Sequence, residues 1–233
     1  MTPLSDLELL TVWEAAQATH PAARGAYLLR ALGDDAPESL PIGTRDRALL
    51  RHRELWFGSH FETVADCPQC GATAELTFET PPVTPSASSM RRITAGGADL
   101  GYRLPDTRDL LAIADCSSVA EARRRLAERC VDAERCVDGE VALSPEVIDA
   151  IAVAMSEADP DGDLRVAITC PDCGNAWDAG FDPASHFWSE VEASALRVLR
   201  EVDALANAYG WSEREILSLP PARRRVYLGM VTS

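Results

Sequence analysis

The sequence predicts an α+β fold that is predominantly helical, with a cysteine-rich ribbon split in two by an inserted mixed α/β subdomain. The motif Cys-Pro-x-Cys-Gly occurs twice, at 67–71 and 170–174, and each copy leads into alternating side chains that suit a β-hairpin. Helix capping signals and apolar residues at helical spacing dominate both ends of the chain. A chain of 233 residues is long enough to bury a substantial core.

The N-terminal region, residues 1–58, is predicted to contain three helices. Ser5 and Glu8 form a capping box for the first helix. The second helix begins at Pro21 and is broken at Gly33. The third follows Thr44 as its N-cap and stops at Gly58.

The two ribbon halves are predicted at 59–80 and 164–181, and residues 81–163 form the inserted subdomain between them. Residues 81–89 are rich in proline and serine, as linkers are. A hairpin is expected around Gly96 and Gly97. Three helices are predicted next, near 106–114, 118–134 and 145–157, the last with Ser144 as N-cap and Pro145 at its first position.

The C-terminal region, residues 182–233, is predicted to be one long helix followed by a short helical hairpin. The long helix runs from 182–183 to Tyr209 and ends at Gly210. Its apolar residues repeat with alternating spacings of three and four. This stripe consists of Trp188, Val191, Ala195, Val198, Val202, Leu205 and Tyr209. Packing on the chain's own N-terminal helices is the favoured interpretation, and packing on a partner helix is the alternative. Ser212 and Glu215 then form a second capping box, and Pro220-Pro221 begins the last helix.

The duplicated motif predicts a metal site. Two cysteines separated by two residues can bind one ion from a single tight turn, and the glycine that follows supplies the positive φ this turn requires. Two such turns provide four thiolates, the tetrahedral set typical of structural Zn²⁺. The predicted ligands are Cys67, Cys70, Cys170 and Cys173. A redox pair would place its first cysteine at a helix N-terminus, and disulfides would need an oxidising compartment. The zinc-ribbon interpretation is therefore favoured.

Other patterns in the sequence do not indicate a catalytic centre. Cys116, Cys130 and Cys136 lack metal-ligand spacing and are expected to be free thiols. The acidic run at 159–163 lacks the glycine and glutamate that a calcium-binding loop requires. All 22 basic residues are arginine, which excludes sites built on a catalytic or phosphate-binding lysine. We therefore expect no enzymatic activity.

The charge of the chain restricts its partners. The net charge is −15, and the pI is near 4.6. Nucleic acids and anionic membranes bind basic surfaces, so neither is an expected partner. The N-terminus lacks the pattern of a signal peptide, and no segment reaches the length of a membrane span. The expected location is the cytoplasm.

Several segments resemble one protein family. These are AYGWSEREILSL at 208–219, RRRVYL at 223–228, LPIGTRD at 40–46, RLPDTRD at 103–109 and both cysteine motifs. In this order they are similar to T4-type baseplate proteins, also described as baseplate hub assembly chaperones, of contractile phage tails and contractile injection systems. The resemblance extends over essentially the whole chain.

The resemblance implies a non-enzymatic role in assembling a baseplate, or as one of its components, with other baseplate or hub proteins as partners. The chain would then be cytoplasmic or incorporated into a phage-tail-like particle. Its candidate contact residues are Trp188, Trp211, Arg224 and Tyr227, because tryptophan, tyrosine and arginine are enriched at interface hot spots. Two alternatives remain at this stage, a zinc-ribbon regulator of nucleic-acid machinery and a metal-dependent hydrolase. The net charge disfavours the first, and the closed ligand set disfavours the second.

Overall fold

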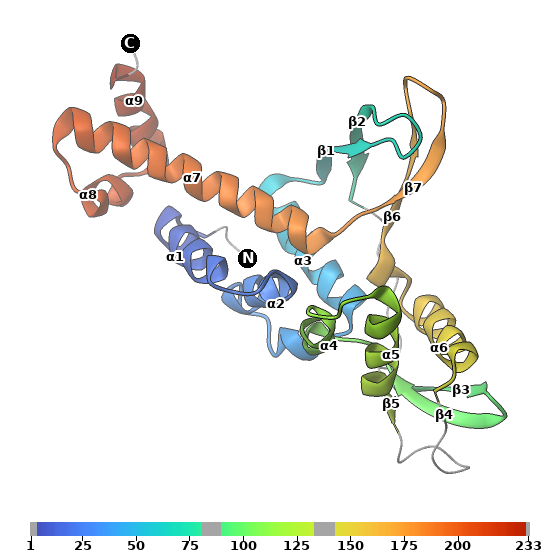
Figure 1. Cartoon of the computed structure of the whole chain (residues 1–233). Helices are drawn as coiled ribbons and strands as arrows, with labels where there is room; N and C mark the ends of the chain where they lie inside the picture. The colour runs from blue at the N-terminus through green and yellow to red at the C-terminus, as the bar shows by residue number, and fades with distance from the viewer. Residues whose placement is uncertain (1–3, 81–89, 133–142, 232–233) are drawn as a thin grey trace. The chain divides into compact units, whose positions relative to one another are not determined.

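The structure, a computed structural model, describes residues 4–80, 90–132 and 143–231 (Figure 1). The predicted linker at 81–89 and Cys136 lie outside these residues. The fold is mixed α/β, with small sheets and about 59% of the described residues in helices. The chain divides into two compact units, one made of residues 1–19 and 186–233 and the other of residues 20–185.

The first unit contains only helices among its described residues. They are α1 (Asp6–Gln17), most of α7 (Pro183–Tyr209), α8 (Glu213–Ser218) and α9 (Pro221–Val231). Both predicted capping boxes are confirmed, since Ser5 caps α1 and Ser212 caps α8 in that geometry. Gly210 ends α7 with a φ of +69°.

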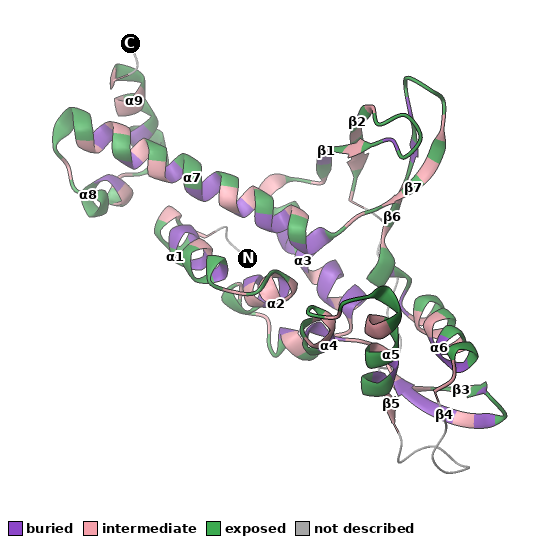
Figure 2. Cartoon of the chain, in the orientation of Figure 1, coloured by how far each residue is buried: buried purple, intermediate pink, exposed green. Residues whose placement is uncertain are grey.

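The predicted apolar stripe of α7 is buried along most of its length (Figure 2). Its members from Trp188 to Leu205 are at most 9% exposed, whereas Tyr209 is 39% exposed. The opposite faces of α7 carry exposed and charged side chains. A 27-residue amphipathic helix of this kind is stabilised mainly by burial of its stripe rather than by intrinsic propensity.

The second unit contains the remaining helices and all the described strands. Its helices are α2 (Pro21–Ala31), α3 (Ile42–Phe57), α4 (Thr107–Ile113), α5 (Val119–Cys130) and α6 (Pro145–Ala158), with short 3₁₀ turns at Pro37–Ser39 and Pro160–Asp163. Its strands are β1 (His60–Asp66), β2 (Thr73–Glu79), β3 (Met90–Ala95), β4 (Ala98–Arg103), β5 (Val131–Asp132), β6 (Arg165–Thr169) and β7 (Ala176–Gly180). Strands β1–β2 and β6–β7 are separate antiparallel hairpins, and β3–β4–β5 form a small sheet.

The predicted start of the third helix is wrong. Helix α3 begins at Ile42, two residues before Thr44, and Pro41 occupies the N-cap without a side-chain hydrogen bond. Distant groups satisfy its first amides instead. The Ile42 amide donates to the Pro105 carbonyl over 3.1 Å, and the Gly43 amide donates to Asp159 Oδ2 over 2.8 Å. Because these acceptors come from other parts of the chain, no local capping residue is needed.

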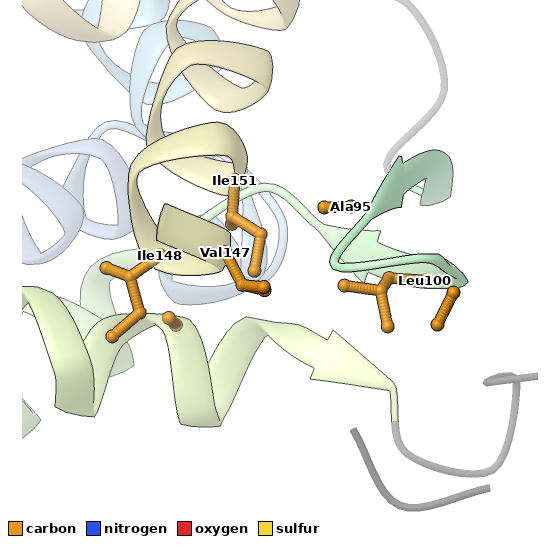
Figure 3. Close-up of a cluster of buried hydrophobic side chains, with 7 residues drawn as sticks. Ala95, Leu100, Val147, Ile148 and Ile151 are labelled. Atoms are coloured by element: carbon orange, nitrogen blue, oxygen red, sulfur yellow. The ribbon is translucent and has the colours of Figure 1, made fainter. Parts of the chain in front are cut away.

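Part of the second unit, between Ala95 and Ile151, contains a cluster of buried hydrophobic side chains (Figure 3). Leu100 of β4 lies on the side of Val147 and Ile151 of α6, and Ile148 belongs to the same cluster. All four residues are at most 8% exposed. The predicted extension of the second inserted helix to residue 134 is wrong, because α5 ends at Cys130 and Val131–Asp132 pair with β4. Residues 133–134 lie outside the described part.

The two segments that share the pattern Leu-Pro…Thr-Arg-Asp meet in space. Pro41 forms an isolated β-bridge with Asp106. Asp106 and Asp109 form a capping box for α4, and the fully buried Asp109 accepts hydrogen bonds from Arg103 and Arg129. These guanidinium groups offset the burial of the carboxylate and keep the pKa of Asp109 well below its usual range. The repeated pattern therefore contributes to a buried polar junction.

Candidate metal centre

The first cysteine turn closes the β1–β2 hairpin. The Cys67 amide donates to the Ala72 carbonyl over 2.8 Å, and the Gly71 amide donates to the Cys67 carbonyl over 2.9 Å. Gly71 has a φ of +74°, a conformation that a side chain would disfavour. The turn therefore directs two sulfur atoms to one side of the hairpin, as the sequence predicts.

The second cysteine turn has the same geometry at the end of the β6–β7 hairpin. The Cys170 amide donates to the Asn175 carbonyl over 2.8 Å, and the Gly174 amide donates to the Cys170 carbonyl over 3.0 Å. Gly174 has a φ of +72°. Cys70 and Cys170 are 100 positions apart in the chain, yet their segments form matching turns.

The four sulfur atoms of these turns form one cluster. The Sγ atoms of Cys67 and Cys173 are 3.7 Å apart, those of Cys70 and Cys170 are 3.6 Å apart, and all four lie within 4.8 Å of one another. These separations far exceed the ~2.05 Å of a disulfide. A tetrahedral ion with metal–sulfur bonds of about 2.3 Å would hold its sulfurs about 3.8 Å apart. The cluster could therefore hold a metal ion.

The electrostatics of the cluster also suit a cation. Burial of the Cys67 thiol opposes ionisation, but the backbone amides of Cys70 and Gln69 point at its sulfur and lower its pKa to about 6. The Ala72 amide favours the Cys70 thiolate, whereas hydrogen bonding with the sulfurs of Cys173 and Cys170 raises its pKa to about 12. Four adjacent sulfurs cannot all ionise unless a positive charge lies between them. A bound cation would supply that charge.

A cluster of three aromatic side chains joins the two hairpins at the other end. Phe61 of β1 stacks on its cross-strand partner Phe78 with ring centroids 5.0 Å apart. Phe181, directly after β7, contacts both rings edge-on at 5.3 and 5.2 Å, and Arg53 lies over the Phe61 ring at 3.8 Å. Phe61 and Cys67 are six positions apart along the strand, which corresponds to about 20 Å. The cysteine motifs do not predict this second junction, although aromatic residues facing each other across a predicted hairpin would have indicated it.

The predicted contact residues of the C-terminal region differ widely in exposure. Trp188 is 6% exposed, so little of it is available to a partner in the structure described. Trp211 and Tyr227 are half-buried and pack edge to face with ring centroids 5.0 Å apart. Tyr209 stacks on Trp211 at 4.7 Å. These rings therefore have a structural role between α7, α8 and α9.

Arg224, the remaining candidate contact residue, is buried rather than exposed. Arg224 is 4% exposed, its Nε donates to Glu201 over 2.8 Å, and its Nη2 pairs with Asp6. It therefore joins α9 to α7 and to the first turn of α1. Its neighbours Arg223 and Arg225 are exposed.

The remaining cysteines and histidines lie outside the sulfur cluster. Cys130 is buried beside Asp109, where burial and the adjacent carboxylate raise its pKa to about 12, and Cys116 is partly buried. Within the described ranges, the four cysteines are the only group of side chains that could hold a metal ion. No helix among the described residues is both long enough and apolar enough to cross a bilayer.

Comparisons with known proteins found no relative of this chain. No protein-family model, curated protein or solved structure matches the chain.

Proposed function

We propose that Cys67, Cys70, Cys170 and Cys173 bind one structural Zn²⁺ and that the two hairpins form a split zinc ribbon. The observation that carries this proposal is the meeting of four sulfurs from two matching turns, with separations near those of a tetrahedral site. Thiolates are strong ligands for zinc, and four of them leave no open coordination position. The ion would therefore stabilise the fold rather than activate water or substrate.

The ion would fix the end of the hairpins that the phenylalanine cluster does not reach. Each hairpin alone is a two-stranded sheet, which is marginally stable in water. Binding of this type can contribute on the order of 10 kcal/mol to folding. The ribbon would then act as a stiff element that holds together segments far apart in the chain.

Elemental analysis of the purified, reduced protein tests this site. We expect one zinc per chain, and we expect Cys170→Ser to lose zinc and to become unstable or insoluble. Cys116→Ser is the matched control, because Cys116 is a partly buried thiol outside the cluster. A ratio well below one zinc per chain in folded wild-type protein would contradict the proposal, as would equal zinc content in both variants.

We propose that the protein is a non-enzymatic assembly factor, or a component, of the baseplate of a phage-tail-like contractile injection system. Support comes from the ordered resemblance to baseplate hub assembly chaperones. The acidic charge of the chain also favours protein partners over nucleic acid or membrane. In this proposal the chain acts in the cytoplasm or in the particle, and its C-terminal helices contact other baseplate or hub proteins.

Two side chains of α9 allow a test of that surface without disturbing Arg224. Val226 and Met230 are 58% and 63% exposed and lie one helical turn apart. Val226→Asp with Met230→Asp should abolish co-purification with co-expressed baseplate proteins. Val119→Asp, at an apolar residue of α5 that is 78% exposed, should leave it intact.

Deletion of the whole gene tests the role itself. We expect particles that lack complete baseplates, and mass spectrometry of wild-type particles will distinguish a retained component from a factor that acts only during assembly. Normal particles in the deletion strain would contradict the proposal. Retardation of nucleic acid at moderate salt would instead favour the regulatory alternative.

A further inference from the structure

A charged cavity of about 400 Å³ lies within the helical unit of residues 1–19 and 186–233. It is formed by the start of α1, one face of α7 and the first turn and a half of α9. Arg197, Arg224 and Arg225 line it, together with the carboxylates of Asp6 and Glu201. Three guanidinium groups therefore surround one cavity in a chain whose net charge is −15.

The two carboxylates are already paired with one arginine. Glu201 accepts from Nε of Arg224, and Asp6 accepts from its Nη2. Nη1 of the same guanidinium is buried and has no hydrogen-bond partner, although Arg224 is only 4% exposed. A buried donor without an acceptor is destabilising, so the two carboxylates leave part of the hydrogen-bonding capacity of Arg224 unused.

The other two arginines of the cavity have no acidic partner in the described part of the chain. Arg197 and Arg225 are both exposed and form no ion pair there. Pro221, the first residue of the 11-residue helix α9, also lines the cavity. The positive end of that helix dipole adds to the charge of the two arginines. The cavity thus has more positive charge than its own carboxylates offset.

We propose that this cavity binds an oxyanion group, a carboxylate or a phosphate, carried by a partner molecule. Guanidinium groups bind both kinds of oxyanion with paired, charge-assisted hydrogen bonds. Cavities of about 300–1,000 Å³ are typical of small-molecule sites, so this one has room for an anionic group and the atoms that carry it. The inference does not depend on the zinc site or on a role in baseplates.

Titration of the full-length, ¹⁵N-labelled protein with inorganic phosphate at constant ionic strength tests the site. The signals to follow are the amides of residues 222–225 and the side-chain Nε–H groups of Arg197 and Arg225. We expect saturable shifts in wild-type protein. The double variant Arg197→Gln and Arg225→Gln should bind at least tenfold more weakly, because it loses both free charges.

Arg223→Gln is the matched control, because Arg223 lies on the same exposed helix but does not line the cavity. It should bind phosphate with wild-type affinity. A parallel titration with acetate distinguishes the two sources: saturation by both anions assigns a general oxyanion site, and saturation by phosphate alone assigns a phosphate site. Shifts that stay linear with both anions would overturn the proposal. Equal weakening by Arg223→Gln would overturn it as well.

Discussion

Replacement of Gly43 by alanine should be among the most damaging single substitutions in the second unit. A Cβ atom at this position would lie 2.2 Å from Oδ1 of Asp159 and 2.8 Å from the amide nitrogen of Gly162. Both distances are shorter than the contacts that real Cβ atoms make, so the side chain of Asp159 and the backbone at Gly162 would both have to move. Asp159 is 6% exposed, and its Oδ2 accepts from the Gly43 amide.

Two costs determine the size of the effect. Displacement of Asp159 would break a buried hydrogen bond to a charged group, which costs about 1.5–3 kcal/mol. Overpacking of this tight contact adds about 1–3 kcal/mol. Together they predict a loss of about 2.5–6 kcal/mol in the free energy of unfolding, a large part of the ~5–15 kcal/mol of a typical domain.

Urea unfolding of zinc-loaded protein, followed by circular dichroism, measures this loss. Gly180→Ala is the control within the same unit, because a Cβ there meets no atom within 4 Å. It should be neutral or stabilise the protein by up to about 1 kcal/mol. The double variant Gly43→Ala with Asp159→Ala removes the obstructing carboxylate and should be more stable than the sum of the two single losses predicts. If Gly43→Ala stays within 1 kcal/mol of wild type, the packing described here is wrong.

Three further predictions concern buried groups. Burial raises the pKa of Asp46 to about 6, although Arg45 opposes this shift. Because the folded-state pKa exceeds the unfolded value, the contribution of Asp46 to stability is complete below about pH 4 and is lost as pH rises through 6, by roughly 3 kcal/mol in total. Asp46→Asn should flatten the pH dependence of urea unfolding in that window, and an unchanged slope would refute the shift. Phe61→Ala should lower the free energy of unfolding by about 3–5 kcal/mol, since the ring is fully buried and contacts two others; a loss below 1 kcal/mol would mean that the aromatic cluster does not join the hairpins. Arg224→Ala should destabilise the helical unit by about 3–5 kcal/mol, because Asp6 and Glu201 lose their shared partner. In thermal unfolding, Arg223→Ala should be nearly neutral, and equal losses in the two variants would contradict the burial of Arg224.

The candidate metal centre could be predicted from the sequence because each half of it is local. A turn of five residues contains its own hydrogen bonds, and its glycine follows from the required backbone angle. Duplication of the turn then identifies the four cysteines of the cluster. Which sulfurs lie closest across the two turns was not predictable, because that depends on how two hairpins meet.

Helix ends were likewise predictable only where the capping groups are close in sequence. The caps at Ser5, Ser144 and Ser212 were predictable, since the side chain that accepts and the amide that donates are within three residues of each other. The start of α3 was not, because its acceptors are Pro105 and Asp159.

The sequence by itself determined the cysteine turns, the helix caps, the glycines that end helices and the apolar stripe of α7. Each depends on groups within a few turns of one another, so the identity of the residues is sufficient. Only the tertiary structure decided that Arg224 is buried between Asp6 and Glu201, that Phe181 joins the two hairpins and that Val131–Asp132 form a strand. Burial and pairing depend on which distant segments meet, and the free energy of those contacts outweighs the local preference of a charged or helical residue.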